Sequence, residues 1–149
     1  MEKITVLITE AHTVLRQGLR ALLQTEREIE IVGEAETSRQ AVRLAKTLKP
    51  DVVVMDIALP QFSGLEATRQ IVKEIPSSRV LILSSYGEDE YVHMSTEAGA
   101  AGYVLIPDDI TDVVRAIREV KKGTAFFSPS ISKRLADHSG VPVKKQFSC

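Results

Sequence analysis

The segment that most constrains the fold runs from Pro50 to Pro60 and reads PDVVVMDIALP. Its centre, residues 52–55, is an apolar run of β-branched residues and one methionine, with no polar alternation. Such a run is typical of a strand that is covered on both faces of a parallel sheet. The strand ends at Asp56, and open α/β sheets bind ligands at the carboxyl ends of their strands. Asp56 is therefore the first candidate for a functional residue.

Similar apolar segments recur along the chain, separated by segments with helical periodicity. Strands are expected at 5–8, 29–34, 52–56, 79–83 and 103–105. Helices are expected at 13–24, 38–48, from about Gly64, at 88–98 and from Ile110. Five strands alternating with five helices predict an α/β fold with a doubly wound parallel sheet. Right-handed crossovers, together with the partly alternating, edge-like pattern of 29–34, favour the strand order 2-1-3-4-5.

The 149 residues suffice for one domain with a full core. We expect this α/β domain to cover residues 1–123, with Asp108 or Asp109 capping its last main helix. A short extra helix is expected at 124–138, with Ser128 as N-cap and Pro129 at the first helical position. Residues 139–149 are polar and irregular, which indicates a tail or the start of a linker.

Composition argues against several functional classes. The net charge of -1 gives no reason to expect tight nucleic-acid binding by this chain. The single cysteine, Cys149, allows neither an internal disulfide nor a cysteine metal cluster. The apolar segment near the N-terminus is too short for a secretory signal or a membrane span, so no membrane association is expected and a cytoplasmic location is the default expectation.

The expected strand order brings several residues to one edge of the sheet. These residues, each at or just past the end of a strand, are Glu10, Asp56, Ser84 and Ile106. His12 follows the first strand as well, and we expect it to start the next helix rather than to act as a ligand or base.

Four separated segments resemble the receiver domain of response regulators of the NarL/LuxR (FixJ) type. They are LITEAH with RQGLRALL (7–12 and 16–23), PDVVVMDIALP (50–60), GLEA (64–67) and GAAGYVL (99–105). The resemblance covers residues 4 to about 122 and implies a signalling module of a two-component phosphorelay, not an enzyme. It implies that a histidine kinase passes a phosphoryl group to Asp56, that Ser84 and Tyr103 are switch residues, and that Pro107 is a candidate for a cis-proline.

Two positions depart from the family pattern. A carboxylate that accepts a phosphoryl group needs a divalent cation beside it, and Mg²⁺ prefers hard oxygen ligands, several of them carboxylates. The family supplies two adjacent acids after the first strand and a lysine before the proline that follows the fifth. Here the acid pair is Glu10-Ala11, and Ile106 takes the lysine position. We therefore expect an atypical receiver in which Glu10 and Asp56 bind Mg²⁺ weakly or not at all, and Asp56 is phosphorylated slowly, transiently or not at all.

Two other functional classes remain beside this interpretation. One is a fully functional phosphoacceptor switch, in which Glu10 and solvent replace the missing groups. The other is a flavodoxin-like flavin protein, which needs a phosphate-binding loop rich in Ser, Thr and Gly after the first strand; TEAHT at 9–13 is a poor one. Phosphohydrolases with an acid two residues after the nucleophile are excluded, because Ala58 occupies that position.

The resemblance also implies partners. A histidine kinase is expected, as is a homodimer, formed either through the fourth helix, fifth strand and fifth helix or through the first and fifth helices. Regulators of this type continue beyond such a linker into a helix-turn-helix domain that binds DNA. We expect that the sequence was shortened or that the natural protein is a receiver alone, and that this chain by itself does not bind DNA.

Overall fold

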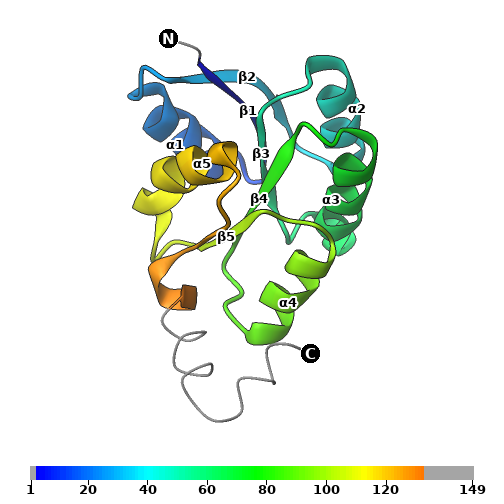
Figure 1. Cartoon of the computed structure of the whole chain (residues 1–149), viewed down its shortest axis with the longest axis vertical. Coiled ribbons are helices and arrows are strands. Elements are labelled where there is room, and N and C mark those ends of the chain that lie inside the picture. Colours follow the sequence, from blue (N-terminus) through cyan, green and yellow to red (C-terminus); the bar gives the residue numbers. More distant parts are fainter. Residues whose placement is uncertain (1–2, 133–149) are drawn as a thin grey trace.

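The computed structural model describes residues 3–132, which form a parallel sheet with helices on both faces (Figure 1). The strands are β1 Ile4–Thr9, β2 Ile29–Ala35, β3 Val52–Asp56, β4 Arg79–Ser84, β5 Gly102–Leu105 and β6 Phe126–Phe127. Neighbouring strands are parallel, and their order is β2-β1-β3-β4-β5-β6. The expected order of the first five strands is confirmed, and β6 extends the sheet beyond β5.

The helices are α1 Thr13–Gln24, α2 Ser38–Leu48, α3 Ser63–Glu74, α4 Asp89–Glu97 and α5 Val113–Lys122. Single 3₁₀ turns at Pro60–Phe62 and Ile110–Asp112 precede α3 and α5. Helix α2 illustrates how local sequence sets the ends. The Thr37 hydroxyl accepts a hydrogen bond from the Gln40 N–H at 3.1 Å, which caps the first turn. At the other end Lys49 is left-handed (φ 46°) and Pro50 follows, so the helix stops.

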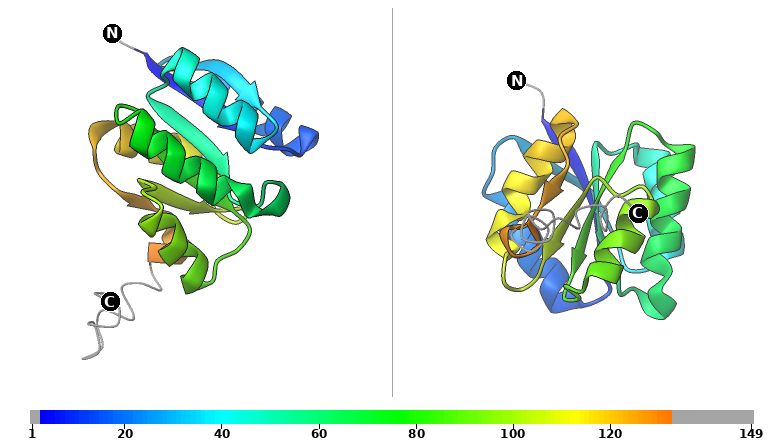
Figure 2. Two further views of the ribbon diagram at one scale, coloured as in Figure 1. Left: turned by 90° about the vertical axis from the view of Figure 1, so that its right-hand side faces the viewer. Right: turned by 60° about the horizontal axis from the view of Figure 1, so that its bottom comes forward.

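The core has two halves, one on each face of the sheet. Val53 and Met55 of β3 pack towards α2, α3 and α4, whereas Val52 and Val54 pack towards α1 and α5. All four side chains are fully buried. Figure 2 shows the two helical layers on either side of the strands. This two-sided burial explains why β3 shows no polar alternation.

The C-terminal part differs from the expectation at two points. Phe126 and Phe127 form β6 rather than starting a helix, and the Phe126 N–H donates to the Ala101 carbonyl at 3.2 Å. A helical turn does begin after Ser128, at 129–132. Ser128 takes the expected N-cap position, because its carbonyl accepts from the Ser132 N–H at 2.8 Å, but its hydroxyl accepts from the Leu105 N–H at 3.0 Å rather than from the turn. The rest of the expected helix (133–138) and the tail (139–149) lie outside the described residues.

The expected aspartate cap of the last main helix is also wrong. Asp109 precedes the 3₁₀ turn without a capping bond from its side chain, and its carboxylate accepts from the Ser130 N–H at 3.2 Å. The side chain therefore ties the loop after β5 to the turn after β6. Over residues 3–132, none of the helices has the length and apolar character required to cross a membrane.

Candidate functional site

A cavity of about 270 Å³ opens at the carboxyl edge of the sheet. It is lined by Glu10, His12, Leu15, Asp56, Ala58, Ser85, Ile106, Pro107 and Ile110. Strands β1 and β3 are neighbours, with Thr9 opposite Met55. Glu10, the residue after Thr9, and Asp56, the residue after Met55, consequently lie side by side, as the expected strand order required.

Glu10 is almost completely buried, with 1% of its surface exposed. Its Oε2 atom accepts a hydrogen bond from the His12 N–H at 2.9 Å and lies 3.0 Å from the His12 Nδ1. Its Oε1 atom is buried and has no hydrogen-bond partner among the described residues. Leaving a carboxylate oxygen buried and unpaired is costly, so a hydrogen-bond donor or a cation beside this atom would be stabilising.

Asp56 is also buried, with 7% of its surface exposed. Burial raises the pKa of Asp56 to about 6 because the charged form loses hydration. A hydrogen bond from the Ala58 N–H to Oδ1, at 2.9 Å, opposes this effect by stabilising the carboxylate. The negative charge of Glu10 raises the pKa of Asp56 further. The site thus holds two acids that are difficult to ionise together.

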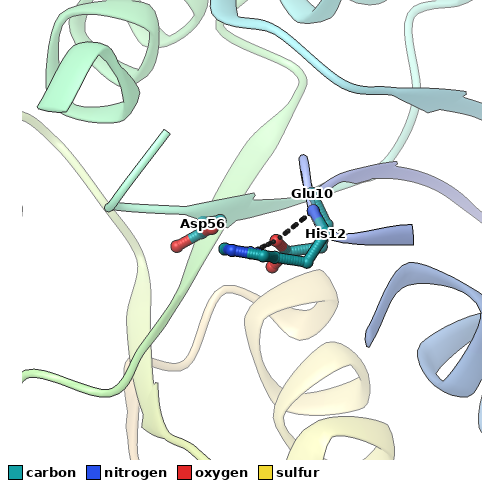
Figure 3. A group of neighbouring side chains, drawn as sticks. All are labelled: Glu10, His12 and Asp56. Carbon is teal, nitrogen blue, oxygen red and sulfur yellow. Dashed lines mark hydrogen bonds and ion pairs between the residues drawn. The ribbon is translucent and has the colours of Figure 1, made fainter. Parts of the chain in front are cut away.

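His12 joins these two acids, which the sequence analysis did not expect. It is the N-cap residue of α1, as expected for a helix start, but its ring also extends over Glu10 towards Asp56 (Figure 3). Ligand atoms of Glu10, His12 and Asp56 all lie within 4.8 Å of one another. The Glu-x-His spacing across the loop after β1 was the sequence signal that could have indicated this cluster.

Ile106 and Ala11 bring apolar surface to the positions where the family resemblance implies charge. Ile106 lines the cavity and packs into the apolar cluster under α1 and α5. Ala11 packs against the cluster on the opposite face. Among the described residues that line the cavity none is Lys or Arg, so the His12 ring is the group there that can become cationic. The Ile106–Pro107 peptide bond is cis, at the position suggested by the resemblance.

Ser84 and Tyr103 meet at Tyr86 rather than at the cavity. The Ser84 hydroxyl accepts from the Tyr86 N–H at 2.9 Å, and the Tyr103 hydroxyl donates to the Tyr86 carbonyl. Both side chains are 1% exposed. Ser85, which the sequence analysis did not single out, is the serine that lines the cavity. The loop after β4 is therefore bonded to β5 through Tyr86.

Comparison with known proteins identifies this arrangement. Residues 6–118 match the model of the response regulator receiver domain. The chain belongs to that family. This receiver has a parallel sheet with an acidic pocket at its carboxyl edge. Asp56 lies in that pocket at the end of β3.

Similar proteins are regulators of the same kind. The receiver is 39% identical over 141 residues to the transcriptional regulatory protein YdfI of Bacillus subtilis, and 36% identical over 132 residues to the response regulator protein VraR of Staphylococcus aureus. These matches cover 95% and 89% of this chain, but only 66% and 63% of the relatives. A crystal structure of a LuxR-family response regulator from Aurantimonas sp. superimposes with a TM-score of 0.88 at 31% identity, covering 94% of this chain and 100% of that one.

Receiver domains bind Mg²⁺ in their acidic pocket, which allows the fit of this site to be tested. The buried, unpaired Oε1 of Glu10 suits a cation. The remaining donors are one carboxylate and one imidazole, and a methyl group stands at position 11. Mg²⁺ requires an octahedron of hard oxygens. The side chains of this cluster offer two carboxylates, so water molecules would supply most of the six oxygens.

Proposed function

We propose that this response regulator receiver is an atypical one, which signals through protein association and in which Mg²⁺-dependent phosphorylation of Asp56 is weak or absent. The observation that carries the proposal is the charge balance of the cavity. Glu10 and Asp56 share it, while Ile106 presents apolar surface in the place implied for a lysine. A second acid that could hold the metal is replaced by the Ala11 methyl group.

The size of the effect follows from the lost ammonium group. A hydrogen bond to a charged group contributes roughly 1.5–3 kcal/mol, so its loss disfavours a bound phosphoryl group by roughly tenfold to a hundredfold. A phosphoryl group also adds negative charge next to the buried Glu10 carboxylate, which burial already makes costly. Both effects act against phospho-Asp56, before weaker metal binding is considered.

Association is supported by exposed apolar side chains on the helices. Val14 of α1 is 84% exposed and Met94 of α4 is 36% exposed. Val14 has the larger exposed fraction of the two, so we place the homodimer contact on the face of α1 and α5 rather than on α4, β5 and α5. A histidine kinase, a cytoplasmic location and a role in transcription regulation complete the proposal, by analogy with the family.

A fully functional switch, phosphorylated at Asp56 by a histidine kinase, is the second candidate. The feature that favours it is the unpaired Glu10 Oε1 beside Asp56, because this is where a cation would neutralise negative charge. In that case Glu10 and water molecules would supply the oxygens that Ala11 does not.

Phosphorylation with acetyl phosphate at millimolar Mg²⁺, followed by intact-protein mass spectrometry, separates the two. We expect little phosphoprotein from the wild type. The double variant Ala11→Asp/Ile106→Lys should give at least about ten times as much phosphoprotein as the wild type. Ala11→Asp/Ile110→Lys places the ammonium elsewhere on the cavity wall and serves as the charge-matched control. Asp56→Asn identifies the acceptor. Wild-type phosphorylation as fast and complete as that of the double variant would overturn the proposal.

A further inference from the structure

We propose that Glu10, His12 and Asp56 form a binding site for a divalent transition-metal cation of the Zn²⁺ class, with His12 as the ligand that distinguishes this cation from Mg²⁺. This metal site uses Glu10 and Asp56, the two acids on which the proposed function rests. It adds the His12 imidazole as a third ligand and a different metal ion. The three residues come from the loop after β1, the start of α1 and the end of β3.

The geometry of the cluster is close to that of a metal site. Its three ligand atoms lie within 4.8 Å of one another. Two ligands of one Zn²⁺ ion lie at most about 4.2 Å apart, because each bond is about 2.1 Å long. The His12 side chain is 76% exposed, so its ring has room to adjust to a bound ion.

The buried Glu10 oxygen supplies an independent indication of a ligand. Oε2 is engaged by the N–H and Nδ1 of His12, which holds the carboxylate in place. Oε1 of the same group is buried without a partner, on a side chain that lines the cavity. A bound cation would pair with this buried oxygen. An exposed acidic cluster differs in this respect, because water already pairs with its oxygens.

The chemistry of the donors selects the metal. Imidazole nitrogen is a ligand for Zn²⁺, Co²⁺ and Ni²⁺, whereas Mg²⁺ takes oxygen ligands. Two carboxylates balance the charge of a divalent ion. Three protein ligands also leave one coordination position open towards the cavity, which Ser85 and Ile106 also line. A metal in this place would link the loop after β1 to the end of β3.

Isothermal titration with ZnCl₂ and with MgCl₂ tests the site on the full chain. The parent protein carries Cys149→Ser and His138→Ala, which remove the other soft donors near the C-terminus. His12→Asn removes the imidazole and keeps a residue type favoured at helix starts. The matched control is His93→Asn, because His93 also pairs with a carboxylate, that of Glu97 at 3.4 Å, but belongs to no group of three possible metal ligands among the described residues.

We expect one Zn²⁺ per chain, and a loss of Zn²⁺ affinity of about tenfold or more in His12→Asn, since even outer-shell partners of metal ligands are worth that much. Mg²⁺ affinity should stay unchanged in His12→Asn, and Zn²⁺ affinity should stay unchanged in His93→Asn. Glu10→Gln should weaken both metals. Tighter binding of Zn²⁺ than of Mg²⁺ does not by itself support the site, because Zn²⁺ binds most nitrogen and oxygen donors more tightly.

Equal Zn²⁺ affinity in His12→Asn and the parent overturns the inference, and so does an equal loss in His93→Asn. Circular dichroism checks that each variant is folded. The outcome is separate from that of the phosphorylation experiment. Ordinary Mg²⁺-dependent phosphorylation together with His12-dependent Zn²⁺ binding would contradict only the proposed function. Weak phosphorylation together with Zn²⁺ binding that does not depend on His12 would contradict only this inference.

Discussion

Glu10 and Asp56 face one cavity from the ends of neighbouring strands, and both carboxyl groups are buried. Burial, followed by the charge of Glu10, raises the pKa of Asp56 to about 6. In the unfolded chain the pKa of this carboxyl group returns to its ordinary value of 3.8. The folded protein therefore keeps a proton on Asp56 over a pH range in which the unfolded chain has lost it.

This difference predicts that Asp56→Asn stabilises the protein in a pH-dependent way. Below about pH 4 both states hold the proton, so the substitution changes little. As pH rises from about 4 to about 6, the wild type loses stability relative to the variant, and the difference levels off at about 3 kcal/mol, from roughly two pKa units at 1.36 kcal/mol each. Urea unfolding at low and at neutral pH measures it. Equal stabilisation at both pH values would contradict the raised pKa.

Gly64 packs so closely against the backbone of Asp56 that a side chain at position 64 should destabilise the fold. A Cβ atom at Gly64 would lie far inside van der Waals contact with the Asp56 carbonyl oxygen and 3.1 Å from the Ile57 Cα. Gly64→Ala should therefore destabilise the protein by about 1–3 kcal/mol through overpacking. Gly18→Ala, in α1 with open space around it, should stabilise by about 0.5–1 kcal/mol. Chemical denaturation of both variants compares them, and effects of the same sign would refute this packing.

Tyr103 and Ser84 should be energetically coupled through Tyr86. Tyr103→Phe removes the hydroxyl that donates to the Tyr86 carbonyl, and Ser84→Ala removes the acceptor of the Tyr86 N–H. Each change should cost about 1 kcal/mol of unfolding free energy. A double-mutant cycle should give a coupling energy of about 0.5 kcal/mol or more, because both side chains hold one loop residue. Strict additivity would mean that Ser84 and Tyr103 act independently.

Self-association should depend on Val14 rather than on Met94. Val14→Asp introduces a charge into the proposed contact of α1 and α5 and should weaken association by about tenfold or more, since an unpaired charge is costly to bury. Met94→Asp carries the same charge on α4 and should have little effect. Sedimentation equilibrium measures both. The reverse pattern would move the contact to α4, β5 and α5, and a wild type that stays monomeric would exclude the homodimer.

Most of the fold could be predicted from the sequence, because its signals are local. Helix α2 was expected with the bounds that it has, since Thr37 and Lys49-Pro50 mark its two ends. The unbroken apolar run of β3 identified the centre of the sheet, and the edge-like β2 fixed the strand order. Strand β6 was missed because two residues carry no periodic signal, and their pairing with β5 is a long-range contact.

The site could be predicted only as far as backbone topology determines it. Glu10 and Asp56 were expected together because adjacent strands end there. The position of the His12 ring over Glu10 depends on a side-chain orientation, which the Glu-x-His spacing permits but backbone topology does not determine. Similarly, Ser85 rather than Ser84 lines the cavity, because the Ser84 hydroxyl is engaged by the Tyr86 N–H.

The most direct test of the proposed loss of Mg²⁺ and phosphoryl binding is an NMR titration with Mg²⁺ in the presence of beryllofluoride, which imitates a phosphoryl group on Asp56. The amide signals of Ser84 and Tyr103 report whether the site closes. Because Ala11 and Ile106 supply neither the acid nor the ammonium, we predict that these signals do not saturate at millimolar Mg²⁺, and that they do in Ala11→Asp/Ile106→Lys. Saturation of the wild type at the same Mg²⁺ concentration as the double variant would contradict the account.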